Sequence, residues 1–98
     1  MKSKHDSSKS LKFEKKIDGK TVVITGGTGS LGQALTKKLL KTGVQTIRIF
    51  SRNENKQVTM LENIEDKDRR LRFFIGDVRD GHRLKHALEG ADIVFHAA

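Results

Sequence analysis

The sequence predicts an α/β domain built on an open, doubly wound sheet of parallel strands. Short apolar runs rich in β-branched residues alternate with stretches of helical periodicity from residue 20 to residue 98. Such alternation is typical of parallel strands joined by right-handed crossovers. The strand-like runs are almost continuously apolar, as in strands that are buried on both faces. The predicted element order is therefore β-α-β-α-β-α-β.

The first predicted unit is a strand, a glycine-rich turn and a helix. The run TVVIT at residues 21–25 lies between glycines and is typical of a strand. Ser30 and Gln33 have the spacing of a capping box, with Ser30 as the N-cap of the following helix. Apolar residues then recur at helical spacing, and Gly43 is predicted to end the helix at the C′ position.

The later elements repeat this pattern along the chain. Each apolar run is followed by a polar residue that is able to cap the next helix. The sequence thus predicts strands over 45–50, 71–76 and 92–97, helix caps at Asn53 and Asp80, and a closing glycine at Gly90.

Length and composition narrow the class of protein. The chain has 98 residues and no cysteine, which allows one small domain without disulfides or thiolate metal sites. Its apolar runs are far shorter than the roughly 20 residues of a membrane span. The first lysines are not followed by an apolar segment of the kind that a secretory signal contains. We expect a cytoplasmic location and no membrane partner.

Positive charge is concentrated at the start of the chain. The formal net charge is +8, and residues 1–20 hold seven lysines against three acidic residues. We expect residues 1–19 to form a solvated basic tail, with one helical turn around Leu11, Phe13 and Ile17. The alternative is an arm that binds polyanions. The chain has no Trp or Tyr to stack on bases, so no nucleic-acid partner is expected.

The stretch TGGTGSLG lies between the first predicted strand and its helix. In a strand–loop–helix unit this glycine spacing predicts a dinucleotide-binding loop. Gly26 allows a tight turn, Gly29 lets the backbone approach a pyrophosphate, and Gly32 lets the helix pack close to the sheet. The N–H groups of the first helical turn, around Ser30 and Leu31, would face the anion. The alternative is a glycine-rich turn without a ligand.

The spacing G-x-x-G-x-x-G resembles the extended branch of the short-chain dehydrogenase/reductase superfamily. The segments TGGTGSLG, FSRNENKQ, RFFIGDVRD and DIVFHAA come in that family's order and spacing. Within it the sequence is most similar to the UDP-N-acetylglucosamine 4,6-dehydratases of polysaccharide biosynthesis, because of SRNENKQ and FFIGDVRD. The resemblance implies the N-terminal part of a Rossmann-like NAD(P)-binding domain over residues 20–98.

The second strand ends in residues that favour NADP over NAD. NAD-binding proteins usually hold the ribose 2′-hydroxyl with an acidic residue at this place. Here Ser51, Arg52 and Lys56 offer a hydroxyl, a guanidinium and an ammonium group to a 2′-phosphate. Glu54, the nearby acid, belongs to the first turn of the next helix. The alternative is that Arg52 and Lys56 are solvated charges.

The resemblance also implies roles near the ends of the third and fourth strands. Asp77 and Val78 would lie along the adenine, although an Asp after a strand is by itself typical of a turn or helix cap. Ala97 falls in a small-residue stretch beside the cofactor. His96 has two interpretations, a catalytic base or a residue that packs or hydrogen-bonds near the loop, of which we favour the second.

The complete set of expected cofactor-binding residues spans the loop and the three later strand ends. It is Gly26, Thr28, Gly29, Ser30, Leu31, Gly32, Ser51, Arg52, Asn53, Glu54, Asn55, Lys56, Asp77, Val78 and Ala97. No metal site is expected, because His82 and His86 have no evident third ligand and fit a solvated helix face.

No catalytic residue is assigned. The resembling enzymes use a Tyr-x-x-x-Lys pair, and this sequence contains no tyrosine. The resemblance implies a lyase that binds NADP, dehydrates UDP-N-acetylglucosamine and is homo-oligomeric at full length. Another nucleotide-sugar epimerase or reductase, and a non-catalytic nucleotide-binding fragment, remain alternatives. We expect these 98 residues to be inactive alone and to leave an apolar sheet face partly exposed.

Overall fold

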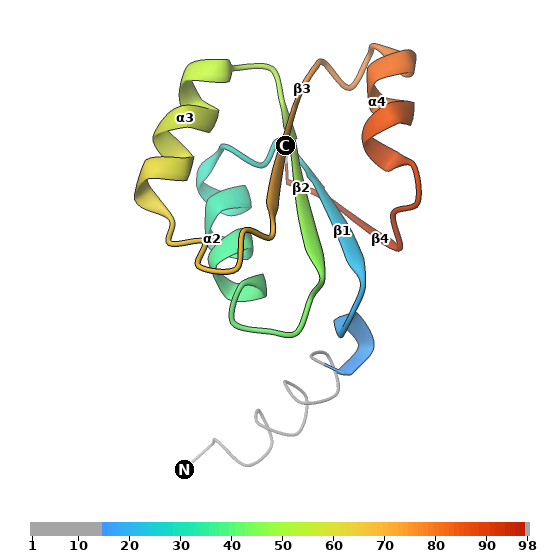
Figure 1. Cartoon of the computed structure of the whole chain (residues 1–98). Helices are drawn as coiled ribbons and strands as arrows, with labels where there is room; N and C mark the ends of the chain where they lie inside the picture. The colour runs from blue at the N-terminus through green and yellow to red at the C-terminus, as the bar shows by residue number, and fades with distance from the viewer. Residues whose placement is uncertain (1–14, 98) are drawn as a thin grey trace.

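The computed structural model describes residues 15–97, and it confirms the predicted α/β fold (Figure 1). All strand pairs are parallel, and the strand order across the sheet is β3-β2-β1-β4. Along the chain the elements are β1 (Thr21–Thr25), α2 (Ser30–Leu39), β2 (Thr46–Ser51), α3 (Glu54–Asn63), β3 (Leu71–Ile75), α4 (Gly81–Leu88) and β4 (Ile93–His96).

The helices lie on both faces of the sheet. Figure 1 shows α2 and α3 together on one side of the strands and α4 on the other. The chain steps from β1 to β2 to β3 in one direction and then returns to place β4 on the free side of β1. Right-handed crossovers in opposite directions put their helices on opposite faces. The reversal between β1 and β4 marks the place where such sheets bind ligands at the carboxyl ends of their strands.

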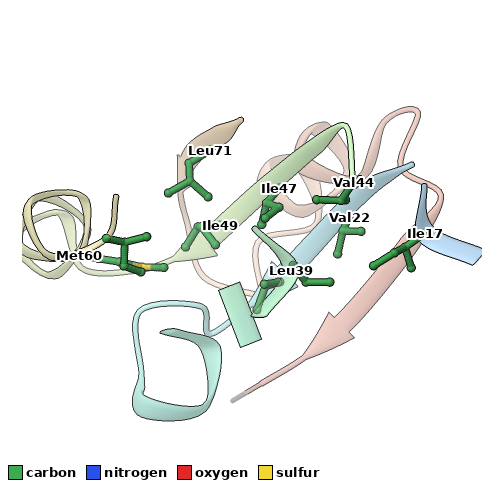
Figure 2. Packing of buried hydrophobic residues seen from close by; sticks show 10 residues of the cluster. Ile17, Val22, Leu39, Val44, Ile47, Ile49, Met60 and Leu71 are labelled. Atoms are coloured by element: carbon green, nitrogen blue, oxygen red, sulfur yellow. The ribbon is translucent and has the colours of Figure 1, made fainter. Parts of the chain in front are cut away.

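The main core lies between the sheet and the pair α2–α3 (Figure 2). Val22 and Ile47 from adjacent strands, Leu39 from α2 and Met60 from α3 are all fully buried there. Ile17 joins them with 1% of its surface exposed, although it lies in the segment that was expected to be a solvated tail. Leu11 and Phe13, the other members of the expected helical turn, lie outside the described residues.

The opposite face of the sheet is covered less completely. Val23 and Phe50 are buried there, whereas Val94 on β4 keeps 50% of its surface exposed. Arg48 ties the end of α4 to this face, because its Nη1 donates to the carbonyl oxygen of Ala87 at 2.8 Å. The structure therefore agrees with the expected partial exposure of an apolar sheet face, and that exposure is found at β4.

Two of the predicted helix boundaries are wrong. Ser30 is not the N-cap of α2, because Gly29 takes that position and no side chain caps the helix. Gln33 instead donates from Nε2 to the carbonyl oxygen of Thr28 at 2.8 Å. Gly43 is not a left-handed C′ residue, since α2 ends at Leu39 and the chain continues through right-handed turns.

The other predicted helix signals are confirmed. The side chain of Asn53 accepts from the N–H of Lys56, and that of Asp80 accepts from two N–H groups of α4. Gly90, with φ +70°, follows the end of α4. These caps work as predicted because they depend only on neighbours within a few residues along the chain.

Candidate functional site

The loop between β1 and α2 requires a glycine at its first position. Gly26 has φ +67°, a conformation that L side chains rarely adopt. Its N–H donates to the carbonyl oxygen of Phe50 at 2.9 Å, and its carbonyl oxygen accepts from Gly29 at 3.2 Å. The turn is thereby fixed to the end of β2, as the expected tight turn off the strand requires.

Gly32 and Gly27 permit two successive close contacts. A Cβ on Gly32 would lie 2.5 Å from the Cα and carbonyl oxygen of Gly27. A Cβ on Gly27 would in turn lie 2.7 Å from Cγ2 of Ile49 on β2. Gly32 therefore lets α2 approach the loop, not the sheet directly as the sequence suggested. Gly27 was not among the residues predicted for the site, although it belongs to the same glycine-rich stretch.

The first turn of α2 keeps free backbone donors. No side chain caps the helix, and the N–H groups of Ser30 and Leu31 donate to no backbone acceptor among the described residues. Gly29 at the N-cap has no close neighbour, since a Cβ there would meet only Gly26 O at 3.6 Å. Free N–H groups at the positive end of a helix dipole favour an anion.

An open cleft of about 850 Å³ lies at the carboxyl ends of β1, β2 and β3. It is bounded by the glycine loop, by the start of α3 and by the turn after β3. Arg52 and Lys56 are exposed there. The lining residues are Gly26, Thr28, Phe50, Ser51, Arg52, Asn53, Glu54, Asn55, Lys56, Gly76, Asp77, Val78 and Arg79.

Most of the expected cofactor-binding residues thus share one cleft, but some lie elsewhere. Gly29, Ser30, Leu31 and Gly32 do not line the cleft and form the start of α2 beside it. Ala97 lies beyond the end of β4, where its N–H donates to the carbonyl oxygen of Thr25 at 2.9 Å. Along this edge of the sheet the loop after β1 lies between the rest of the cleft, at β2 and β3, and Ala97 after β4.

Ser51 is held in place by a residue that the sequence analysis did not single out. Gln57, which is 5% exposed, donates from Nε2 to Ser51 Oγ and to the carbonyl oxygen of Phe74, both at 2.9 Å. Gln57 thus links α3 to the ends of β2 and β3. Because Ser51 Oγ accepts this bond, its own proton remains available to a ligand.

Asp77 lies between two arginines at the cleft. Its Oδ2 accepts from Arg79 Nη2 at 2.7 Å and lies 3.7 Å from Arg52 Nη1. Arg79 also donates its backbone N–H to Asp77 Oδ1 at 2.9 Å. The side-chain hydrogen bond from Arg79, followed by this backbone bond, holds the pKa of Asp77 well below its usual range. The same hydrogen bond raises the pKa of Arg79.

The histidines take up local contacts. His96 hydrogen-bonds through Nδ1 to the hydroxyl of Thr25, immediately before the glycine loop, as the favoured interpretation predicted. Nδ1 of His86 lies 3.2 Å from Oε1 of Glu89, and the His86 ring packs in a T-shaped arrangement with the Phe74 ring. Within residues 15–97, no three His, Cys, Asp or Glu side chains gather as a metal site would require.

In the part of the chain that the structure describes, no helix has the length and apolar character needed to cross a membrane.

Known proteins match both the sequence and the fold. The family described as "Polysaccharide biosynthesis protein" matches residues 22–98. A UDP-glucose 4-epimerase of Rickettsia conorii is 48% identical over 83 residues, which cover 81% of this chain and 24% of the relative. The X-ray structure of Pen from Bacillus thuringiensis has a TM-score of 0.79 and 39% identity, covering 84% of this chain and 26% of that one.

A further solved structure carries nucleotides. The Bordetella bronchiseptica enzyme WbmF, in complex with NAD+ and UDP, has a TM-score of 0.69 and 25% identity. The match covers 85% of this chain and 24% of WbmF. The chain thus spans about a quarter of the length of the curated relatives that it matches. These matches confirm the resemblance to the N-terminal region of extended short-chain dehydrogenases/reductases, and the chain belongs to the polysaccharide biosynthesis protein family.

Proposed function

We propose that this chain is the N-terminal cofactor-binding region of an NADP-dependent nucleotide-sugar dehydratase that acts on UDP-N-acetylglucosamine. The observation that carries the proposal is the cleft, in which Arg52 and Lys56 stand beside a glycine loop with free backbone donors. The relatives support the nucleotide-sugar class, since one is named a UDP-glucose 4-epimerase and another is a complex with NAD+ and UDP.

The glycine loop suits the pyrophosphate of the cofactor. The open space at Gly29 admits a phosphate close to the backbone, and Ser30 and Leu31 present N–H groups to its oxygens. Gln33 donates from Nε2 to the carbonyl oxygen of Thr28 at 2.8 Å, which reduces the repulsion between this oxygen and an anion. Each of these features lowers the cost of placing negative charge at the start of α2.

The end of β2 suits a 2′-phosphate. Arg52 is 73% exposed and able to form two parallel hydrogen bonds with a phosphate. Lys56 adds a second positive charge, and Ser51 Oγ has a proton to donate. An NAD-type site would place an acid where Ser51 and Arg52 stand. These residues therefore favour NADP over NAD.

The chain binds and orients the cofactor in this proposal. When bound, the nicotinamide supplies reversible hydride transfer, which is the chemistry that protein side chains lack. Asp77 and Val78 line the cleft after β3, and in this proposal they lie along the adenine. No residue of these 98 is assigned to proton transfer during the reaction. The chain alone is therefore expected to bind nucleotide without turning over a sugar.

Calorimetric titration of the chain with NADP+ and NAD+ tests this proposal. We expect saturable binding that favours NADP+, and the change Arg52→Ala should raise the Kd for NADP+ about tenfold or more, because a charge-assisted bidentate contact is lost. Lys85→Ala is the matched control, since it removes an equal charge on α4, away from the cleft. Equal affinity for the two nucleotides, or no binding by the folded chain, would contradict the proposal.

A UDP-sugar epimerase is the second candidate function, favoured by the 48% identity to the Rickettsia conorii enzyme. Both candidates use the same cleft, so the cofactor titration does not separate them. Analysis of the sugar product does: a dehydratase releases a nucleotide sugar lighter by one water, whereas an epimerase leaves the mass unchanged. The assay requires an enzyme in which residues 22–97 are joined to the remaining length of a relative.

A further inference from the structure

Two guanidinium groups bind the same carboxylate oxygen at the cleft. Asp77 Oδ2 accepts from Arg79 Nη2 at 2.7 Å, while Arg52 Nη1 stays at 3.7 Å. Arg79 adds contacts from Nε to Oδ1 at 3.1 Å and to Oδ2 at 3.2 Å, and from its backbone N–H to Oδ1. The carboxylate is therefore bound tightly by Arg79 and only loosely by Arg52.

The local chain geometry produces this arrangement. Asp77 and Arg79 are two residues apart in the turn between β3 and α4, and the N–H of Asp80 closes that turn on the carbonyl oxygen of Asp77 at 2.8 Å. Asp77 keeps 27% of its side chain exposed, whereas Arg52 and Arg79 are 73% and 82% exposed. Arg52 thus comes from a different strand end and remains free to turn toward a ligand.

We propose that Arg79 is a specificity-determining residue for the 2′-phosphate, because it occupies the Asp77 carboxylate and leaves Arg52 available to the phosphate. This inference rests on the proposed cofactor function. Without Arg79, Asp77 would draw Arg52 into an ion pair, and Arg52 would then be less available to the phosphate. The carboxylate would then resemble the acid that NAD-binding proteins direct at the ribose hydroxyl.

The charge balance of the cleft supports this role. Its lining includes the cations Arg52, Lys56 and Arg79 and the anions Glu54 and Asp77. Removal of Arg79 leaves two charges of each sign, so that the excess of positive charge disappears. A phosphate dianion depends on this excess, whereas the neutral 2′-hydroxyl of NAD does not. Arg79 should therefore affect the two nucleotides differently.

The test is a double-mutant cycle on the Kd values for NADP+ and NAD+, measured by calorimetry on the full 98-residue chain. The variants are Arg79→Ala, Asp77→Asn and the two combined, with Lys85→Ala as the control for loss of surface charge. Arg79→Ala should weaken NADP+ about tenfold and leave NAD+ within about twofold. Adding Asp77→Asn should restore most of the preference, because the freed carboxylate is then gone.

A further variant, Arg79→Lys, separates the effect of the guanidinium geometry from the effect of the positive charge. Arg79→Lys keeps the positive charge but loses the planar contact through two nitrogens. It should therefore lower the preference for NADP+ by less than Arg79→Ala does. A thermal melt of each variant shows whether the fold is intact, and the ratio of the two Kd values is insensitive to a uniform loss of folded protein.

The outcomes distinguish this inference from the function on which it rests. If the unaltered chain shows no preference for NADP+, the proposed function fails and this inference fails with it. If the preference exists and depends on Arg52, but Arg79→Ala leaves the ratio unchanged, only the inference on Arg79 is overturned. Additive effects of Arg79→Ala and Asp77→Asn would overturn it in the same way.

Discussion

The helices α2 and α4 begin at the same edge of the sheet, yet their first turns are built differently. In α4, the side chain of Asp80 accepts from the N–H groups of His82 and Arg83 at 3.2 and 3.3 Å. In α2, no side chain caps the helix, and the N-cap is Gly29. The donors that α4 satisfies internally are left free in α2.

The glycine loop accounts for this difference between the two helices. A side-chain cap stabilises a helix through a local hydrogen bond and fills the space in front of it. The loop before α2 leaves that space open, and its glycines hold the helix by close backbone contact, as at Gly32 against Gly27. The helix α3 follows the pattern of α4, because Asn53 accepts from the N–H of Lys56 at 3.1 Å. Of these three helices, α2 is therefore the one whose first turn has no side-chain cap.

The largest loss of stability is expected from a change at Gly32, where the start of α2 differs most from the start of α4. In Gly32→Ala the new Cβ would lie 2.5 Å from backbone atoms of Gly27, so the helix and loop must separate. We expect the free energy of unfolding to fall by about 1–3 kcal/mol. Urea denaturation of the chain, followed by circular dichroism, measures it.

Gly81→Ala is the matched control in the first turn of α4. A Cβ there meets nothing within 4 Å, and Gly81 has no positive φ. Because alanine favours the helix more than glycine does, we expect a gain of up to about 1 kcal/mol. If Gly32→Ala were tolerated as well as Gly81→Ala, the close contact between α2 and its loop would have no energetic importance.

An intermediate loss in the free energy of unfolding is expected when a helix loses its N-terminal cap. Asp80→Ala should lower the free energy of unfolding by about 1 kcal/mol, because two N–H groups of α4 lose their acceptor. Ser30→Ala should change it by less than about 0.5 kcal/mol, since Ser30 lies within α2 and caps nothing. Equal losses in the two variants, measured by the same denaturation, would mean that α2 is capped by a side chain after all.

The smallest effect is expected in the pH dependence of stability that arises from Asp77, in the turn before α4. The folded state lowers the pKa of Asp77, mainly through the hydrogen bond from Arg79, so this carboxylate stabilises the fold above about pH 4. That contribution should be lost as the pH falls below about 4, and it should be small because the arginine is exposed to water.

Comparison of stability at neutral and acidic pH measures this contribution. We expect Asp77→Asn and Arg79→Ala each to flatten the dependence, because either change removes the bridge. A dependence that survives both changes would have to come from other carboxylates of the chain. Stability that rose with acidification would reverse the sign that the lowered pKa requires.

Much of the fold could be predicted from the sequence because its signals are local. The alternation of apolar runs with helical periodicity predicted the parallel sheet, and Asn53, Asp80 and Gly90 act at helix ends as their positions indicated. The capping box failed because Gly29, not Ser30, is the N-cap, and because the side chain of Gln33 donates to the carbonyl oxygen of Thr28. Ile17, which lies in the segment predicted to be a tail, packs in the core, a contact that no local pattern indicated.

The sequence alone predicts the order of the elements, the glycine spacing and the kinds of charged residue at each strand end. Which of these residues meet depends on the fold: Gln57 on α3 donates to both Ser51 on β2 and Phe74 on β3, and Asp77 Oδ2 lies 3.7 Å from Arg52 Nη1. Periodicity and caps depend on neighbours a few residues away, and so they can be recognised in the chain. Contacts between the ends of different strands depend on sheet order and register, which only the folded sheet defines.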